Sequence, residues 1–289
     1  MARGLACAAL ILVVLTGSYR RVERVAIILG LFELAFFGVA YMASPNLGDL
    51  IQGSIDIPFA NKDYLYLAAA NIGAVIMPWM IFYQQSAIAD KKLGPEHYTA
   101  AKIDTALGSV MTQLVMAAVL VAAAATIGAK SNDATLNTVG DMSQALTPFL
   151  GEITGKLVFG IGILGAAMVA AIVCSLALAW GVGEVAGFRR SLEHKPTEAG
   201  WFYGIYTAAV IAGGALVAVW PNLVDLNIDV QIMNALMLPI VLGFLIALAA
   251  RALPEQHRLK GTYLWVVIAV SAITTLFGVF GGLQGAGVF

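Results

Sequence analysis

The sequence predicts an all-α integral membrane protein with eight transmembrane helices, and three observations lead to this fold class. Hydrophobic residues make up 60% of the 289 residues and charged residues only 11%, whereas a soluble domain carries about 25% charged residues. The mean hydropathy is +0.87, and the apolar residues are collected in runs long enough for helices that cross a bilayer. Within most runs they cover all sides of a helix, which is typical of helices in lipid.

The apolar runs follow one another with mostly short polar connections; the longer ones are residues 44–63 and 129–154. Transmembrane β-strands would be about ten residues long and would alternate in polarity, whereas these runs are longer and do not alternate. We expect all the helices in a single membrane domain, residues 1–289. The expected helices are residues 4–17, 22–43, 64–89, 103–128, 155–186, 201–220, 229–250 and 262–283.

Basic residues in the connections indicate the orientation. The connections after the first, third, fifth and seventh runs, together with the adjoining ends of the runs, hold twelve Lys and Arg residues, and the opposite side holds only four, Arg3, Lys62, Lys130 and Lys156. Cytoplasmic connections are enriched in Lys and Arg. We therefore expect a multi-pass protein of the cell (inner) membrane with both termini on the non-cytoplasmic side.

Charge and motifs exclude several classes of function. The net charge is −1, so no basic field attracts nucleic acid. Cys7 and Cys174 lie in apolar runs without the spacing of a zinc or redox motif, and the common phosphate-binding, zinc-protease and serine-hydrolase motifs are absent. Because no nucleophile–base pair is evident, we expect neither an enzyme nor a bound cofactor. We expect membrane lipid to surround the helices of this protein.

The run at residues 64–89 contains the strongest functional signal. Residues 73–78 read Gly-Ala-Val-Ile-Met-Pro, and Pro78 has no N–H to donate to the carbonyl of Ala74. Gly73 makes an opening of the backbone easier, and freed carbonyls at membrane depth must be buried in protein or face a water-filled cavity. Discontinuous helices of this kind build ion sites in secondary transporters, and an ordinary proline kink is the alternative. We favour a transport site at this break.

Further polar side chains lie inside the runs. Gln231 and Asn234 are three residues apart on one helix face, and Pro239 follows them. These amides either contact an ion or water, or bond to a neighbouring helix. Glu33 lies in the middle of the second run, where a carboxylate is a functional candidate by default. The other candidates for a cavity or for coupling are Asn71, Trp79 and Gln113.

Three stretches of the sequence together resemble the Nramp family of divalent metal ion transporters. Residues 73–78 are similar to the signature of the family's sixth helix, residues 17–24 to its loop between helices four and five, and residues 231–239 to its tenth helix. The resemblance implies that the chain corresponds to family helices four to eleven, in an N-terminally truncated and divergent member.

The same resemblance implies a partial inverted-repeat fold of the leucine-transporter type. Residues 1–43 are then the last two helices of a first repeat, residues 64–250 the complete second five-helix repeat, and residues 262–283 an extra helix. The implied activity is transport of a divalent metal ion. The implied metal ligands are the carbonyl of Ala74, the sulfur of Met77 and the amide of Gln231. A thioether is a soft ligand, which favours Mn²⁺ or Fe²⁺ over Mg²⁺ or Ca²⁺.

The sequence also departs from the family pattern. The Asp-Pro-Gly-Asn break of the family's first helix is absent, as are the acidic residues of its third helix and the arginines of its ninth, and Trp79 stands where the family usually has histidine. These departures argue against proton coupling, so protons are only a candidate partner. Two or three neutral ligands are a poor site for a dication in a low dielectric. We therefore expect the 289-residue chain alone to bind metal weakly.

Two alternatives stay open. Amino-acid and other cation transporters of the same architecture also use a broken sixth helix, and anionic organic substrates favour helix N-termini at such breaks. The second alternative is a truncated membrane component that transports nothing.

Overall fold

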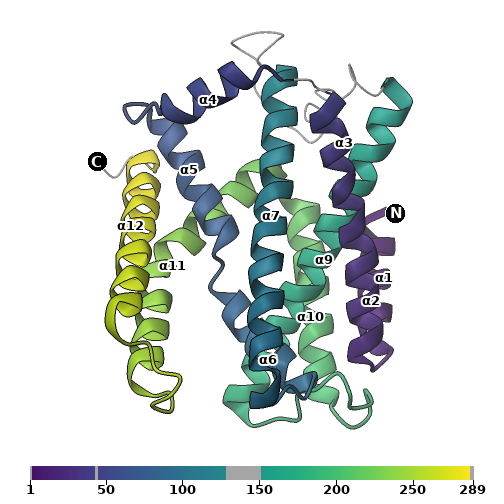
Figure 1. Ribbon diagram of the computed structural model, residues 1–289. Coiled ribbons are helices and arrows are strands. Elements are labelled where there is room, and N and C mark those ends of the chain that lie inside the picture. Colours follow the sequence, from purple (N-terminus) through teal and green to yellow (C-terminus); the bar gives the residue numbers. More distant parts are fainter. Residues whose placement is uncertain (1, 43–44, 128–150, 287–289) are drawn as a thin grey trace. The chain divides into compact units, whose positions relative to one another are not determined.

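The computed structural model describes residues 2–42, 45–127 and 151–286 of the chain. In this part of the chain every regular element is a helix (Figure 1), which confirms the predicted all-α class. The α-helices are α1 (Ala2–Leu15), α2 (Tyr19–Leu31), α3 (Ala35–Met42), α4 (Leu47–Ile55), α5 (Lys62–Val75), α6 (Trp79–Asp90), α7 (Tyr98–Ile127), α9 (Glu152–Ala186), α10 (Gly200–Val219), α11 (Leu223–Arg251) and α12 (Gly261–Gly285). Two 3₁₀ turns, η1 (Phe32–Leu34) and η2 (Pro95–His97), precede α3 and α7.

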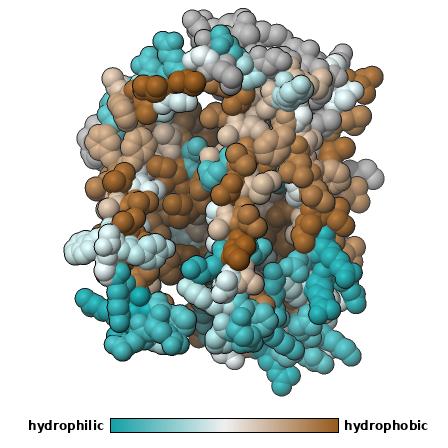
Figure 2. Space-filling model, in the orientation of Figure 1, coloured by the Kyte–Doolittle hydropathy of each residue, from teal (hydrophilic) through white to brown (hydrophobic). Residues whose placement is uncertain are grey.

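The described residues contain seven helical segments that are long and apolar enough to cross a membrane. Figure 2 shows hydrophobic residues along the flanks of the helices and hydrophilic residues gathered around helix ends. The first predicted run forms only a shorter apolar helix, Gly4–Leu15, so the predicted count of eight spans is corrected to seven long helices and one short one among these residues. The run ends early because Gly17, with φ of 62°, turns the chain.

The predicted polar connection at residues 44–63 contains a helix, α4, that the hydropathy of the longer runs did not indicate. Its apolar residues Ile51 and Ile55 are four positions apart, which is the spacing of one helix face. The other long connection, residues 129–154, lies almost entirely outside the described residues.

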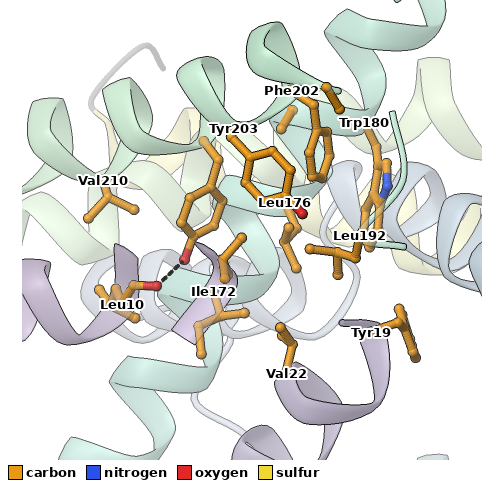
Figure 3. Packing of buried hydrophobic residues seen from close by; sticks show 14 of the residues in the cluster. Leu10, Tyr19, Val22, Ile172, Leu176, Trp180, Leu192, Phe202, Tyr203 and Val210 are labelled. Carbon is orange, nitrogen blue, oxygen red and sulfur yellow. Dashed lines mark hydrogen bonds between the residues drawn. The ribbon is translucent and has the colours of Figure 1, made fainter. Parts of the chain in front are cut away.

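The helices divide into two compact units, and unit 1 comprises Met1–Ile55 and Phe82–Pro221. Its main core lies between α1, α2, α9 and α10 (Figure 3). The side chains of Trp180 on α9 and of Phe202 on α10 are fully buried there. Aromatic burial therefore holds the centre of this unit together.

A buried hydrogen bond joins α10 to α1 inside this core. The hydroxyl of Tyr206 donates to the backbone carbonyl of Leu10 over 3.1 Å, drawn as a dashed line in Figure 3. Tyr206→Phe removes only the donor, so we expect the free energy of unfolding to fall by about 1 kcal/mol. Denaturant titration in detergent micelles measures this change. An equal loss in Tyr263→Phe, whose side chain is 67% exposed on α12, would contradict the prediction.

Unit 2 comprises Asp56–Ile81 and Asn222–Phe289, so its helices α5, α11 and α12 come from two separate stretches of the chain. The three helices pack pairwise against one another. Glycine permits close approach: a Cβ built on Gly281 of α12 would lie 2.7 Å from the carbonyl oxygen of Leu65 on α5. Asn61 and Asn222 cap the N-termini of α5 and α11 with their side-chain oxygens.

These units differ in extent from the predicted repeats at residues 1–43 and 64–250. The division into units follows the packing of the helices. The repeat assignment follows the family resemblance and stays a prediction.

Candidate functional site

The membrane span Lys62–Asp90 is interrupted near its middle. Residues 76–78 separate the end of α5 from the start of α6 and are not helical (Figure 1). At Ile76 the backbone turns to φ −116° and ψ 80°, and its N–H donates the last hydrogen bond of the helix, to the carbonyl of Ile72 over 3.0 Å. The chain therefore has two helices here instead of one continuous helix with a kink.

This interruption changes the hydrogen bonding of the last turn of α5. Pro78 has no N–H, so the carbonyl of Ala74 lacks the donor that a continuous helix would supply four residues further on. The carbonyl end of a helix also carries partial negative charge. Met77 lies between the two helices, and both Ala74 and Met77 are partly buried. A carbonyl oxygen and a thioether in the middle of a span are chemically suited to a cation.

Gly73 places the end of α5 directly against α11. A Cβ built on Gly73 would overlap the carbonyl oxygen of Gln231 and would lie 2.8 Å from the carbonyl carbon of that residue. The backbone nitrogen of Ala235 would be 2.9 Å away. Because all these atoms belong to the backbone, only a residue without a side chain fits. Two of the residues singled out in the sequence, Gly73 and Gln231, are thus in direct contact within unit 2.

Three amide side chains follow one face of α11 beside this contact. Gln231 Nε2 donates to Asn227 Oδ1 over 3.1 Å, and Asn234 Nδ2 donates to Gln231 Oε1 over 3.0 Å. The side chain of Asn234 is buried, with 6% of its surface exposed. Sequence analysis missed Asn227 because the seventh predicted run began at residue 229. Its separation of four residues from Gln231 was the signal that could have identified it.

A hydrogen bond between side chains also joins α5 to α11. The hydroxyl of Tyr66 donates to Asp229 Oδ1 over 3.0 Å. Asp229 is exposed and lies within the first turns of α11. Together with the Gly73 contact, this bond fixes the alignment of the two helices along their length.

The remaining predicted site residues are divided between the two units. Asn71 is exposed on α5, and Trp79, partly buried, is the first residue of α6. Glu33 is partly buried in η1 and Gln113 is exposed on α7; both belong to unit 1. Among the described residues, no group of three or more His, Cys, Asp or Glu side chains could hold a metal ion.

Comparison with known proteins gives a family match over almost the whole chain. Residues 2–283 match the model of the Nramp family, described as natural resistance-associated macrophage protein-like. Among curated proteins, the divalent metal cation transporters MntH of Agrobacterium fabrum, Erwinia tasmaniensis and Brucella suis are 27%, 31% and 28% identical to this chain over 169, 155 and 182 residues. These matches cover 55%, 50% and 58% of the chain and 36%, 36% and 39% of the relatives. The matched regions are therefore well under half of each relative.

Proposed function

Because the chain belongs to the Nramp family, we propose that it moves divalent metal cations across the membrane, with Mn²⁺ and Fe²⁺ as preferred cargo. The observation that carries the proposal is the interruption at residues 76–78 in the middle of a membrane span. The similar curated proteins are named divalent metal cation transporters. The metal is a transported substrate, so the activity requires neither a resident cofactor nor an enzymatic step.

The proposed ligands are two groups at the break and one on α11. The carbonyl of Ala74 and the amide oxygen of Gln231 are hard ligands, which any divalent cation accepts. The sulfur of Met77 is soft and discriminates in favour of Mn²⁺ and Fe²⁺ over Mg²⁺ and Ca²⁺. The contact of Gly73 with Gln231 supports this set, because it brings α11 against the end of α5.

Neutral ligands alone do not balance the charge of a dication in a low-dielectric medium, so the proposal includes a carboxylate. Glu33, which lies inside the span Tyr19–Met42 and is partly buried, is a candidate for a cavity or for coupling. Asn71, Trp79, Asn234 and Gln113 are the candidates for lining the path or for coupling.

The proposed location is the inner membrane, with both termini of this chain on the non-cytoplasmic side. The excess of basic residues on one side supports this orientation. We propose facilitated movement of the metal, without proton coupling. Trp79 in place of the usual histidine and the absence of charged residues from α10 support that choice.

An amino-acid substrate is the second candidate function. α6 begins directly after the break, and the N-terminus of a helix attracts the carboxylate of such a substrate. The end of α5, with its carbonyls, attracts a cation instead. Competition between the two kinds of substrate distinguishes them.

Uptake of radioactive Mn²⁺ by cells that express the protein from its complete reading frame tests the proposal. We expect saturable uptake that Fe²⁺ inhibits and that amino acids leave unchanged, with cells lacking the gene as the control. Collapse of the pH gradient is expected to leave the uptake unchanged. Uptake of a labelled amino acid in place of Mn²⁺ would favour the second candidate, and uptake of neither would contradict transport.

A further inference from the structure

The amide side chains of Asn227, Gln231 and Asn234 are joined by two hydrogen bonds that run in the same direction along α11. Gln231 donates to Asn227 and Asn234 donates to Gln231. The NH₂ groups of Gln231 and Asn234 therefore face the N-terminal end of α11, and the oxygen of Gln231 faces the other way, toward Asn234. The alignment lets each bond polarise the next.

The direction of these two hydrogen bonds decides which end of the Gln231 amide is available to a cation. A glutamine amide presents either an oxygen, which binds cations, or an NH₂ group, which repels them. Here the NH₂ group is engaged by Asn227. Asn234 uses one of the two lone pairs of Gln231 Oε1, and the second lone pair is left for a ligand.

The oxygen of Gln231 faces the part of α11 that packs on Gly73, in the last turn of α5. It faces Asn234, and the next residue, Ala235, has the backbone nitrogen that a Cβ on Gly73 would approach to 2.9 Å. The side chain of a helical residue lies over the preceding turn of its own helix, which sets the amide of Asn234 level with Gln231. The oriented amides and the end of α5 therefore lie at the same depth of unit 2.

We propose that Asn227 is a positioning residue that sets the affinity for the transported metal by holding the Gln231 amide with its oxygen toward the break. This inference rests on the proposed function, in which Gln231 is a metal ligand. Asn227 itself does not contact the metal. Without its acceptor oxygen, the Gln231 amide is free to turn its NH₂ group toward the cation.

A purely structural role is the competing explanation, since amides on one helix face satisfy one another's hydrogen bonds and stabilise the fold. The two roles differ in what they change. A structural role alters stability and the amount of folded protein. A positioning role alters the KM for the metal and acts only while Gln231 is present.

The experiment measures Mn²⁺ uptake for Asn227→Ala and Asn227→Asp, each alone and combined with Gln231→Ala. We expect Asn227→Ala to raise the apparent KM for Mn²⁺ about three- to tenfold, the range of one hydrogen bond, with kcat unchanged. Aspartate accepts hydrogen bonds and cannot donate them, so Asn227→Asp is expected to keep a KM no higher than that of the unsubstituted protein. In the Gln231→Ala background neither substitution at Asn227 is expected to change the KM further.

The control is Gln256→Ala, which removes an exposed amide from the connection between α11 and α12 and is expected to leave the KM unchanged. The inference is overturned if Asn227→Ala leaves the KM unchanged, if Asn227→Asp is as harmful as Asn227→Ala, or if either effect persists without Gln231. An unsubstituted protein that takes up no divalent cation overturns the proposed function and this inference with it. Normal uptake with an unaffected Asn227→Ala variant overturns the inference alone.

Discussion

Replacing Gly73 by alanine is expected to reduce Mn²⁺ uptake at least tenfold and to lower the free energy of unfolding by roughly 1–3 kcal/mol. The added Cβ would overlap the carbonyl oxygen of Gln231 and crowd the backbone nitrogen of Ala235. Side chains can rotate away from a new methyl group, but backbone atoms in the middle of a helix cannot. α5 must therefore move away from α11, and the end of α5 loses its place beside the Gln231 amide.

Gly278→Ala is the matched control for this prediction. It adds the same methyl group in the same unit, but its Cβ would meet only side-chain atoms of Ile72 and Ala235, at 3.5 and 3.6 Å, which is ordinary van der Waals contact. Uptake and denaturant titration, both normalised to the amount of folded protein, give the comparison. Equal losses in the two variants, or no loss in Gly73→Ala, would show that the close contact between α5 and α11 is not required.

Met77→Ala is expected to reduce the preference for Mn²⁺ over Ca²⁺ roughly tenfold, which corresponds to about 1.4 kcal/mol. Met77 supplies the only soft atom of the proposed ligand set. Without it, the site consists of oxygen atoms, which hard cations prefer. Alanine is compatible with the non-helical conformation between α5 and α6, so the break itself is expected to persist. Uptake of labelled Mn²⁺ in the presence of increasing Ca²⁺ measures the preference.

Met80→Ala provides the control, because Met80 is the second residue of α6 and is 43% exposed. It removes a thioether of the same kind from a side chain outside the proposed site. The expected result is an unchanged Mn²⁺ preference. If Met77→Ala gives the same result as Met80→Ala, the proposed role of the Met77 sulfur is wrong.

Sequence alone predicted the features that depend on local chemistry. The run of apolar residues dictates helices in lipid wherever it occurs, and the missing N–H of Pro78 affects the carbonyl of Ala74 in any surroundings. α1 has 14 residues, as many as the predicted run at residues 4–17, so the error lay in counting so short a run as a full span. α4 was not predicted because it has only nine residues and its apolar residues occupy one helix face.

The contacts between helices at the candidate site could not be predicted from the sequence. Gly73 and Gln231 are 158 positions apart, and no spacing rule connects residues on different helices. The glycine looked like an aid to opening the backbone, whereas the structure gives it a second role as the point where two helices touch. The bond from Gln231 to Asn227 lies within one helix and was accessible to spacing arguments once the start of α11 was known.

Unit 2 is built from two stretches that lie far apart in the sequence. During synthesis, its helices therefore become available at different times. Residues 82–221 lie between the two stretches, and a ribosome that adds about 5–20 residues per second takes roughly 7–28 seconds to synthesise them. During that interval α5 has left the ribosome while α11 and α12 do not yet exist. The packing of α5 within unit 2 is therefore expected to be a late event of biosynthesis, completed only when α11 and α12 have been made.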